Sequence, residues 1–196
     1  MTHLDAAQLI ERCRSGEEDA VARLVQANQP AVYRLALSIL DDPADADEAT
    51  QETFLAALRS LGDYRAQAAL RTWLFAIAIN VCRSRLRQRQ TRQHLHLLLR
   101  GAWLTGAEPA QPESAMVQRQ ANDTVWRAVQ ALGEKHRLPV VLRYYHDLPV
   151  DEIAAVLGLS AGTVHSRLSI ARDRLRAALV EDPAAVRSEV EPKWQP

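Results

Sequence analysis

The side chains most able to do chemistry in this sequence are hydrogen-bond donors and cations that recur at helical spacing. They are Thr163, His165, Ser166, Arg167, Ser169, Arg172 and Arg176. Groups of this kind donate to phosphate oxygens and to base edges, and one helix that carries them is narrow enough to enter the major groove of DNA. The pattern favours binding of duplex DNA. A helical hairpin whose basic face contacts only water is the alternative.

A helix-turn-helix over residues 148–179 would position these side chains. Apolar residues recur at helical spacing on both sides of a turn: Ile153, Ala154 and Leu157, then Val164, Leu168, Ala171 and Leu175. Gly158 stands where a helix ends in the left-handed conformation, which glycine adopts without strain. Ser160 is suited to cap the next helix, because its hydroxyl can accept from the N–H groups of Gly162 or Thr163. The sequence therefore predicts a helix-turn-helix with an exposed recognition helix.

Charge is segregated along a chain whose 24 Lys and Arg residues balance its 24 Asp and Glu residues. Residues 1–62 hold 5 basic and 11 acidic residues, a net charge of −6, whereas residues 63–100 hold 8 and 1, a net charge of +7. Residues 137–180 hold 6 and 4, a net charge of +2. An acidic block followed by a basic block predicts two partners of different chemistry.

The acidic block includes a predicted helix over residues 45–61. Its outward face carries four polar residues, which are Asp47, Glu48, Gln51 and Glu52. Its apolar residues, which are expected to point inward, are Phe54, Leu55, Leu58 and Leu61. An acidic helix face usually serves only solubility. From this pattern alone, binding of a partner is the less favoured alternative.

The basic block combines aromatic rings with cations in and after a short polar loop. Over residues 63–93 its arginines are Arg65, Arg71, Arg83, Arg85, Arg87, Arg89 and Arg92, and Tyr64 and Trp73 lie among them. Rings that stack on unpaired bases, next to cations that follow phosphates, are what single-stranded nucleic acid requires. Alternatively, the rings belong to the core and the arginines favour a helix C-terminus. A buried stripe is expected from Trp73, Leu74, Ile77, Val81 and Leu86.

Apolar residues recur at helical spacing in the other segments as well, and the chain has only seven glycines. The expected fold class is therefore all-α. Residues 4–28 form one or two helices with a break at Gly16, and another helix follows Pro30 and ends at residues 41–43. Helices over residues 121–132 and 138–145 come later. Their expected inward residues are Val125, Val129, Leu132, Val141, Leu142 and Tyr145.

No cofactor, metal site or catalytic activity is expected. The sequence has no glycine-rich phosphate loop, HExxH motif or nucleophile elbow. His94 and His96 with Cys82 would be three scattered metal ligands without a fourth. Cys13 and Cys82 fit no disulfide framework, which indicates a reducing compartment. No signal peptide opens the sequence and no apolar run of about twenty residues occurs, so we expect a cytoplasmic protein without membrane insertion.

Three segments carry a family resemblance. They are ILDDPADADEATQETFLAALRSL, YRAQAALRTWLFAIAINVCRSRLR and ALGEKHRLPVVLRYYHDLPVDEIAAVLGLSAGTVHSRLSIARDRLRAAL, which together span most of the chain. In order and spacing they resemble the small extracytoplasmic-function (ECF) sigma factors of bacterial RNA polymerase. The resemblance implies sigma domain 2 over residues 1–93, a flexible linker over 94–119, sigma domain 4 over 120–180 and a tail over 181–196.

The resemblance also implies partners and site residues. The acidic helix would dock on the β′ clamp helices of the polymerase core through Asp47, Glu48, Gln51, Glu52 and Phe54. The melted strand of the −10 element would be read by Tyr64, Arg65, Arg71, Asn80, Arg83 and Arg87. The −35 duplex would be read by Ser160, Thr163, His165, Ser166, Arg167, Ser169 and Arg172. Domain 4 would also grip the β flap, and an anti-sigma factor that holds the protein inactive is a family expectation.

The sequence departs from the family pattern on both DNA surfaces. The loop has Ala66 and Gln67 where a glycine and an acid are common, and Ile170 stands where a second basic residue often falls. Ala76 and Ile79 likewise replace common arginines. A stand-alone helix-turn-helix regulator and a helical interaction protein are the alternatives to a sigma factor. The first domain distinguishes them, because a repressor needs no acidic docking helix followed by a basic aromatic loop.

Overall fold

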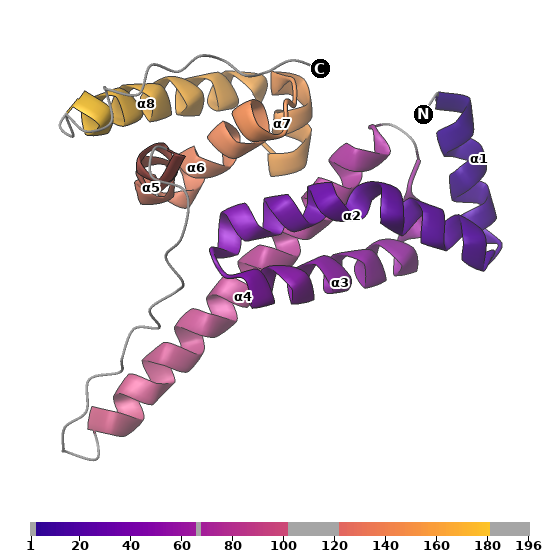
Figure 1. The fold of residues 1–196 in the computed structure, drawn as a ribbon, viewed down its shortest axis with the longest axis horizontal. Coiled ribbons are helices and arrows are strands. Elements are labelled where there is room, and N and C mark those ends of the chain that lie inside the picture. The colour runs from indigo at the N-terminus through magenta and orange to yellow at the C-terminus, as the bar shows by residue number, and fades with distance from the viewer. Residues whose placement is uncertain (1–2, 66–67, 102–121, 181–196) are drawn as a thin grey trace. The chain divides into compact units, whose positions relative to one another are not determined.

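The computed structural model describes residues 3–65, 68–101 and 122–180, and helices joined by short turns make up these ranges (Figure 1). The elements are α1 (His3–Arg14), α2 (Glu18–Leu40), α3 (Pro43–Arg59), η1 (Leu61–Asp63), α4 (Leu70–Gly101), α5 (Asn122–Ala131), α6 (Glu134–Val140), η2 (Val141–Tyr145), α7 (Val150–Leu157) and α8 (Ala161–Val180). These ranges contain no β-strand, which confirms the all-α class.

Contacts divide the chain into two compact units. One comprises Met1–Gly106 with Asp151–Leu159, and the other comprises Ala107–Val150 with Ser160–Pro196. We call α1–α4 the first lobe, and α5, α6, η2 and α8 the second lobe. The domain boundaries expected from the sequence stay a prediction.

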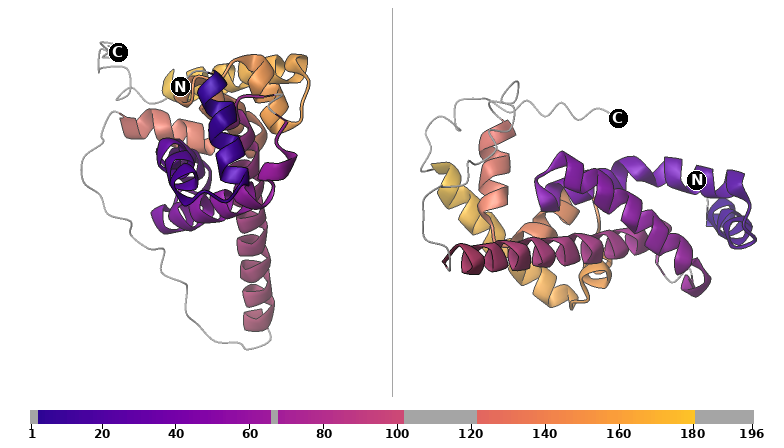
Figure 2. Two further views of the ribbon diagram at one scale, coloured as in Figure 1. Left: turned by 90° about the vertical axis from the view of Figure 1, so that its right-hand side faces the viewer. Right: turned by 90° about the horizontal axis from the view of Figure 1, so that it is seen from below.

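The first lobe is built on three helices, α2, α3 and α4, which pack on one another, while α1 packs on α2. Its most buried large side chains are Leu24, Leu35, Leu74, Phe75 and Ile79. Figure 1 and Figure 2 show α4 continuing past the ends of α2 and α3. The backbone of α4 is helical as far as Gly101, so the segment after residue 93 begins as a prolongation of this helix. The apolar side chains that follow residue 94 lie outside the described side chains.

Helix α2 passes through Pro30 without a break, although the sequence suggested a division there. Pro30 and Gln26, the residue whose carbonyl loses its helical partner, are both exposed. Helix α2 ends where the sequence predicted, at residues 41–43. Asp41 adopts a left-handed φ of 55°, the Asp42 carboxylate accepts from the Asp45 N–H at 2.8 Å, and Pro43 opens α3.

The inward face of α3 differs from the expected one at Leu55. Phe54 is 6% exposed and Leu61 is 3% exposed, as predicted, and Leu58 is half-buried. The prediction that Leu55 points inward was wrong, because this side chain is 55% exposed. The buried positions of α3 are Ala46, Ala49, Thr50, Thr53, Phe54 and Ala57. Leu55 follows Phe54 by one residue, a rotation of about 100° that carries it out of this stripe.

The second lobe buries Leu132, Leu138, Val141, Leu142, Val164 and Leu168, and both α5 and α6 pack on α8. Helix α6 begins at Glu134, four residues before the expected start. It continues into η2, a π-helical turn in which the His146 N–H donates to the Val141 carbonyl at 3.1 Å. The wider turn changes which residue faces inward. His146 is 2% exposed and Tyr145 is 52% exposed, so the expected burial of Tyr145 was wrong.

Val125 was also expected to point inward, and this expectation was wrong because the side chain is 48% exposed. The inward residues at the end of α5 are Val129 and Leu132. Val125 lies one turn before Val129, close to the first described side chain of α5. The half-buried ring of Trp126 instead packs beside Tyr145, with ring centroids 6.2 Å apart.

The turn between α7 and α8 has the predicted form. Gly158 has a φ of +64°, and the Leu159 N–H donates to the Ala154 carbonyl at 2.9 Å, which closes the end of α7. Ser160 then caps α8, because its Oγ accepts from the Thr163 N–H at 3.2 Å. Ile153, Ala154 and Val156 are buried on α7. Local residue types are enough to specify this connection.

No single helix within the described ranges is long and apolar enough to cross a membrane. Helices α7 and α8 pass such a test only when taken together, and the chain bends by 102° at the break between them.

The neighbouring residues Phe54 and Leu55 provide a matched test of the α3 packing. We expect Phe54→Ala to lower the free energy of unfolding by about 3–5 kcal/mol, because it removes a buried ring and leaves a cavity. Leu55→Ala should change it by less than about 0.5 kcal/mol, because that side chain is largely in water. Urea unfolding of the full chain, followed by circular dichroism, measures both. Equal losses for the two variants would contradict the assigned orientation of α3.

Candidate docking and nucleic-acid interfaces

The four polar residues of α3 lie on the surface, as predicted. Asp47, Glu48, Gln51 and Glu52 are all exposed, and we call them the acidic face. Phe54, which was grouped with them, lies in the core below. A partner on this surface would therefore meet the exposed Leu55, one helical turn after Gln51, instead of Phe54. The sequence pattern missed Leu55 because its apolar type suggested burial.

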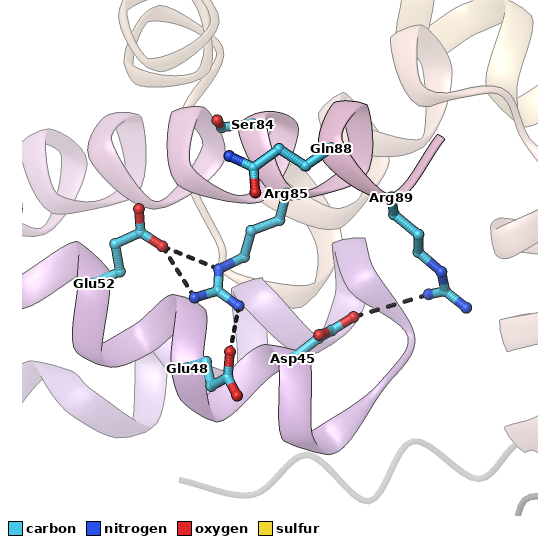
Figure 3. A pocket seen from close by; sticks show the side chains of 7 residues that line it. All are labelled: Asp45, Glu48, Glu52, Ser84, Arg85, Gln88 and Arg89. Atoms are coloured by element: carbon cyan, nitrogen blue, oxygen red, sulfur yellow. Dashed lines mark hydrogen bonds and ion pairs between the residues drawn. The ribbon is translucent and has the colours of Figure 1, made fainter. Parts of the chain in front are cut away.

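Two arginines of α4 reach this part of α3 (Figure 3). Arg85 bridges two carboxylates: its Nη1 lies 2.8 Å from Glu48 Oε2, and its Nη2 lies 3.0 Å from Glu52 Oε2. Arg89 lies 3.9 Å from Asp45. With Ser84 and Gln88, these residues line a groove of about 460 Å³ between the two helices. The acidic face is thus partly neutralised from within the lobe.

The bridge by Arg85 fixes the positions of Glu48 and Glu52 more than it stabilises the fold. The hydrogen bond to Glu48 is the main reason why the pKa of Arg85 is raised, so this guanidinium stays charged. Ion pairs between exposed groups contribute only about 0–1 kcal/mol each. Asp47 forms no salt bridge with any residue in the described parts of the chain. It is therefore the carboxylate of the acidic face most available to a partner.

Three predicted site residues of α4 lie on a different face from Arg85. Asn80, Arg83 and Arg87 follow one another at steps of three and four residues, which places them on one side of the helix. Asn80 and Arg87 are exposed, and Arg83 is half-buried. We call these three residues the polar face of α4. Among the described arginines of α4, Arg85 and Arg89 thus face α3, whereas Arg87 is exposed on another face.

The residues before α4 form a packed corner. The Tyr64 and Trp73 rings have centroids 5.1 Å apart at an interplanar angle of 52°, and the Tyr64 hydroxyl donates to the Ala68 carbonyl at 2.7 Å. Tyr64 is 9% exposed, and burial raises its pKa. Its ring is therefore occupied by packing, which fits the alternative that it belongs to the core. Exposed Arg65 follows it directly.

Two cations contact this corner. The Arg71 guanidinium, at the start of α4, lies 5.1 Å from the centroid of the Phe75 ring. Arg14, in the last turn of α1, donates to the Tyr64 carbonyl at 2.6 Å and to the Leu61 carbonyl at 3.2 Å. Sequence reasoning missed Arg14, because its acceptors lie about fifty residues away in the chain and no local sequence pattern predicts such contacts.

Helix α8 exposes most of its predicted DNA-binding residues. His165, Ser166, Ser169 and Arg172 are exposed, while Thr163 and Arg167 are half-buried. Val164, Leu168 and Ala171 are buried on the opposite side, as expected. Ser160 and Thr163 are engaged with each other at the helix start, with their hydroxyl oxygens 2.8 Å apart. On the other side, the ring Nδ1 of buried His136 lies 3.4 Å from the Arg167 carbonyl and links α6 to α8.

Comparison with known proteins identifies the family. Residues 24–92 match the family model of Sigma-70 region 2, and residues 128–177 match that of Sigma-70, region 4. The chain is 32% identical over 185 residues to the RNA polymerase sigma-H factor of Pseudomonas aeruginosa, over 91% of this chain and 96% of that protein. It belongs to the extracytoplasmic-function sigma factors of RNA polymerase. The ECF RNA polymerase sigma factor SigW of Bacillus subtilis is 28% identical over 176 residues, which cover 87% of this chain and 94% of SigW.

The fold of this ECF sigma factor also resembles solved structures. CnrH, solved in complex with the cytosolic domain of CnrY, matches with a TM-score of 0.64 and 28% identity over 89% of this chain and 96% of that one. The chain is therefore a sigma factor that confers promoter recognition and DNA melting on RNA polymerase in transcription initiation. A stand-alone helix-turn-helix regulator is not favoured, and the family to which the chain belongs is not one of enzymes.

The cap on α8 leads to a prediction about stability. Ser160→Ala should lower the free energy of unfolding by about 1 kcal/mol, because the Thr163 N–H loses its acceptor. Ser160→Asp should retain most of this stability, since a carboxylate caps equally well and suits the positive end of the helix dipole. Urea unfolding of the full chain measures both variants. If alanine is tolerated as well as aspartate, Ser160 does not serve as a cap in solution.

Proposed function

We propose that this sigma factor works through three separate surfaces. The acidic face with Leu55 docks on the β′ clamp helices of the polymerase core. The polar face of α4, with the corner at Tyr64 and Arg65, holds the melted strand of the −10 element. The exposed face of α8 reads the −35 element as duplex. The observation that carries the proposal is the division of α4, which turns Arg85 and Arg89 toward carboxylates of α3 and leaves Asn80 and Arg87 exposed on another face.

Charge and preorganisation support the docking role of α3. Arg85 holds the Glu48 and Glu52 carboxylates in place before any partner arrives, so less side-chain entropy is lost on binding. Asp47 supplies a carboxylate that is free to pair with a partner cation, and Leu55 supplies an apolar contact beside it. A polar rim around an exposed apolar side chain is the usual composition of a protein interface. The partner surface should accordingly be basic with an apolar contact point.

The −10 role of α4 is supported by the exposure of Asn80 and Arg87 on one helix face. Cations there can follow the phosphates of a single strand, while the Asn80 amide can both donate to and accept from the edge of an unstacked base. Tyr64 shapes the corner that precedes this face and does not itself offer a free ring. We therefore assign Tyr64 a supporting role in strand binding.

The second lobe has an apolar surface that suits a further protein contact. Val125, Tyr144 and Tyr145 are 48%, 56% and 52% exposed, and the Trp126 ring adjoins Tyr145. We assign this surface to the β flap of the polymerase, because exposed aromatic side chains are typical anchors of protein interfaces.

CnrH was solved with the cytosolic domain of another protein, CnrY. By analogy, we propose that the present chain also binds an anti-sigma factor. We further propose that this sigma factor acts in the cytoplasm and has no catalytic activity of its own.

Transcription with purified components tests the proposed function as a whole. Bacterial core RNA polymerase should initiate from a subset of a randomised promoter library only when this protein is added. The protein alone should retain duplex DNA poorly, in contrast to a conventional repressor. The proposal fails if the protein does not bind core polymerase and directs no initiation.

Reversing the charge of Asp47 tests the docking face. Asp47→Lys should weaken binding to core polymerase by at least about tenfold at low salt, because a repulsive pair replaces an attractive one. Asp19→Lys makes the same charge change at an exposed position of α2 and serves as the matched control. Fluorescence anisotropy of labelled protein against core enzyme measures both affinities. An equal effect of the two variants would indicate general electrostatics and would exclude a specific role for α3.

Replacing Asn80 tests the −10 assignment. Asn80→Ala should reduce open complexes by roughly three- to tenfold, the value of one lost hydrogen bond to an unpaired base. Binding of the closed complex should change much less. Gln88→Ala removes an exposed amide from the groove side of α4 and is the matched control in preassembled holoenzyme. Permanganate reactivity of unpaired thymines measures strand opening, and equal reactivity for wild type and Asn80→Ala would refute the assignment.

A further inference from the structure

Helix α8 presents one large apolar side chain among polar ones. Ile170 is 41% exposed, and it is the sole large exposed apolar residue among the described side chains of α8. Single exposed apolar residues are common on ordinary surfaces. The position of Ile170 on this helix gives it significance, because the same face is the one available to duplex DNA.

Helical spacing places Ile170 on the exposed face of α8, between its midline and the edge that carries Arg167 and Arg174. Ser166, Ser169 and Asp173 lie four residues before it, one before it and three after it, and all three are exposed. The buried residues Val164, Leu168 and Ala171 lie on the other side of the helix. Before Ile170, the exposed face therefore carries the small neutral side chains of Ser166 and Ser169, and the first charge after Ile170 near its midline is Asp173.

Cations lie at the two edges of this face. His165 and Arg172, seven residues apart, share one edge, and Arg167 and Arg174, also seven apart, share the other. A helix in the major groove has a phosphate backbone on each side and base edges in front of it. The first turns of α8 match this environment, with cations beside the backbones and with Ser166, Ser169 and Ile170 over the bases, and Asp173 follows on the next turn, 3.6 Å from Arg176.

The chemistry of Ile170 selects one base. In the major groove, thymine alone presents an apolar group, its 5-methyl, among donors and acceptors. The short serine side chains let the helix approach, and the longer isoleucine then projects beyond them toward the bases. Its β-branched side chain has few rotamers, so it loses little entropy when it is fixed. We propose that Ile170 contacts the 5-methyl of a thymine in the −35 element and thereby specifies thymine at one position.

This inference rests on the proposed role of α8 in reading duplex DNA, and the experiment separates the two. Holoenzyme made from wild-type protein first selects −35 sequences from a randomised upstream duplex. Each thymine of the selected site is then replaced, one at a time, by deoxyuridine, which pairs identically and lacks the 5-methyl. Binding of each duplex is measured for holoenzymes with wild type, Ile170→Ala and Ile170→Val.

At one position, deoxyuridine should weaken binding of wild type by roughly fourfold, the value of one buried methyl-sized group. Ile170→Ala should lose a similar factor on the thymine duplex and show no further loss with deoxyuridine, since both changes remove one contact. Ile170→Val, which keeps the branched carbon, should retain part of the sensitivity. Ser169→Ala is the matched control from the same face, and it should leave the deoxyuridine effect intact.

A second variant tests the same position by gain of function. Ile170→Arg should shift the selected base there from thymine to guanine, because arginine donates to guanine O6 and N7. The inference is overturned if the selected site contains no thymine whose methyl matters, or if Ile170→Ala keeps full sensitivity to deoxyuridine. If wild-type holoenzyme selects no upstream sequence at all, the −35 role of α8 fails as well, and the inference fails with it.

Discussion

The packing of α4 against α2 and α3 determines what the first lobe can do. Leu74, Phe75, Ala78, Ile79 and Cys82 are each at most 1% exposed and form one stripe of α4. Burial raises the pKa of the Cys82 thiol to about 12, which reflects how completely this stripe excludes water. Once the stripe is buried, the rotation of α4 about its own axis is fixed. A shift of one residue would turn the helix by about 100° and redirect every arginine on it.

The magnitudes show that this burial, and not the ion pairs, decides where the arginines point. Each fully buried aliphatic or aromatic side chain contributes about 1.5–3 kcal/mol. Each exposed salt bridge, such as those of Arg85, contributes about 0–1 kcal/mol. The apolar stripe therefore sets the geometry, and Arg85 and Arg89 find the carboxylates of α3 as a consequence. Although the basic block carries +7 in sequence, its described arginines do not all face the same way, because Arg85 and Arg89 pair with carboxylates of α3 while Arg87 is exposed on another face.

Local features of the structure followed from the sequence, and features that depend on distant partners did not. The helix ends at Asp41–Pro43 and Gly158–Ser160 were predictable, because single residues determine them through conformation or capping. The bridge from Arg85 to Glu48, and the contact of Arg14 with the Tyr64 carbonyl, join segments 37 and 50 residues apart. No periodicity encodes them. The prediction that Tyr145 is buried assumed a regular helical period. It was wrong because the π-helical turn η2 buries His146 instead.

Under the proposed function, the modest charge of residues 137–180 favours joint action of the two lobes at a promoter. Residues 137–180 carry a net charge of only +2, and Asp173 and Arg176 lie 3.6 Å apart on α8 itself. Affinity for duplex DNA comes mainly from neutralised phosphates, so a helix with few unopposed cations binds weakly by itself. Docking of the first lobe on the polymerase would supply the missing affinity by raising the effective concentration of α8 at the promoter. The central contacts of α8 are then free to provide specificity, because they need not hold the complex together.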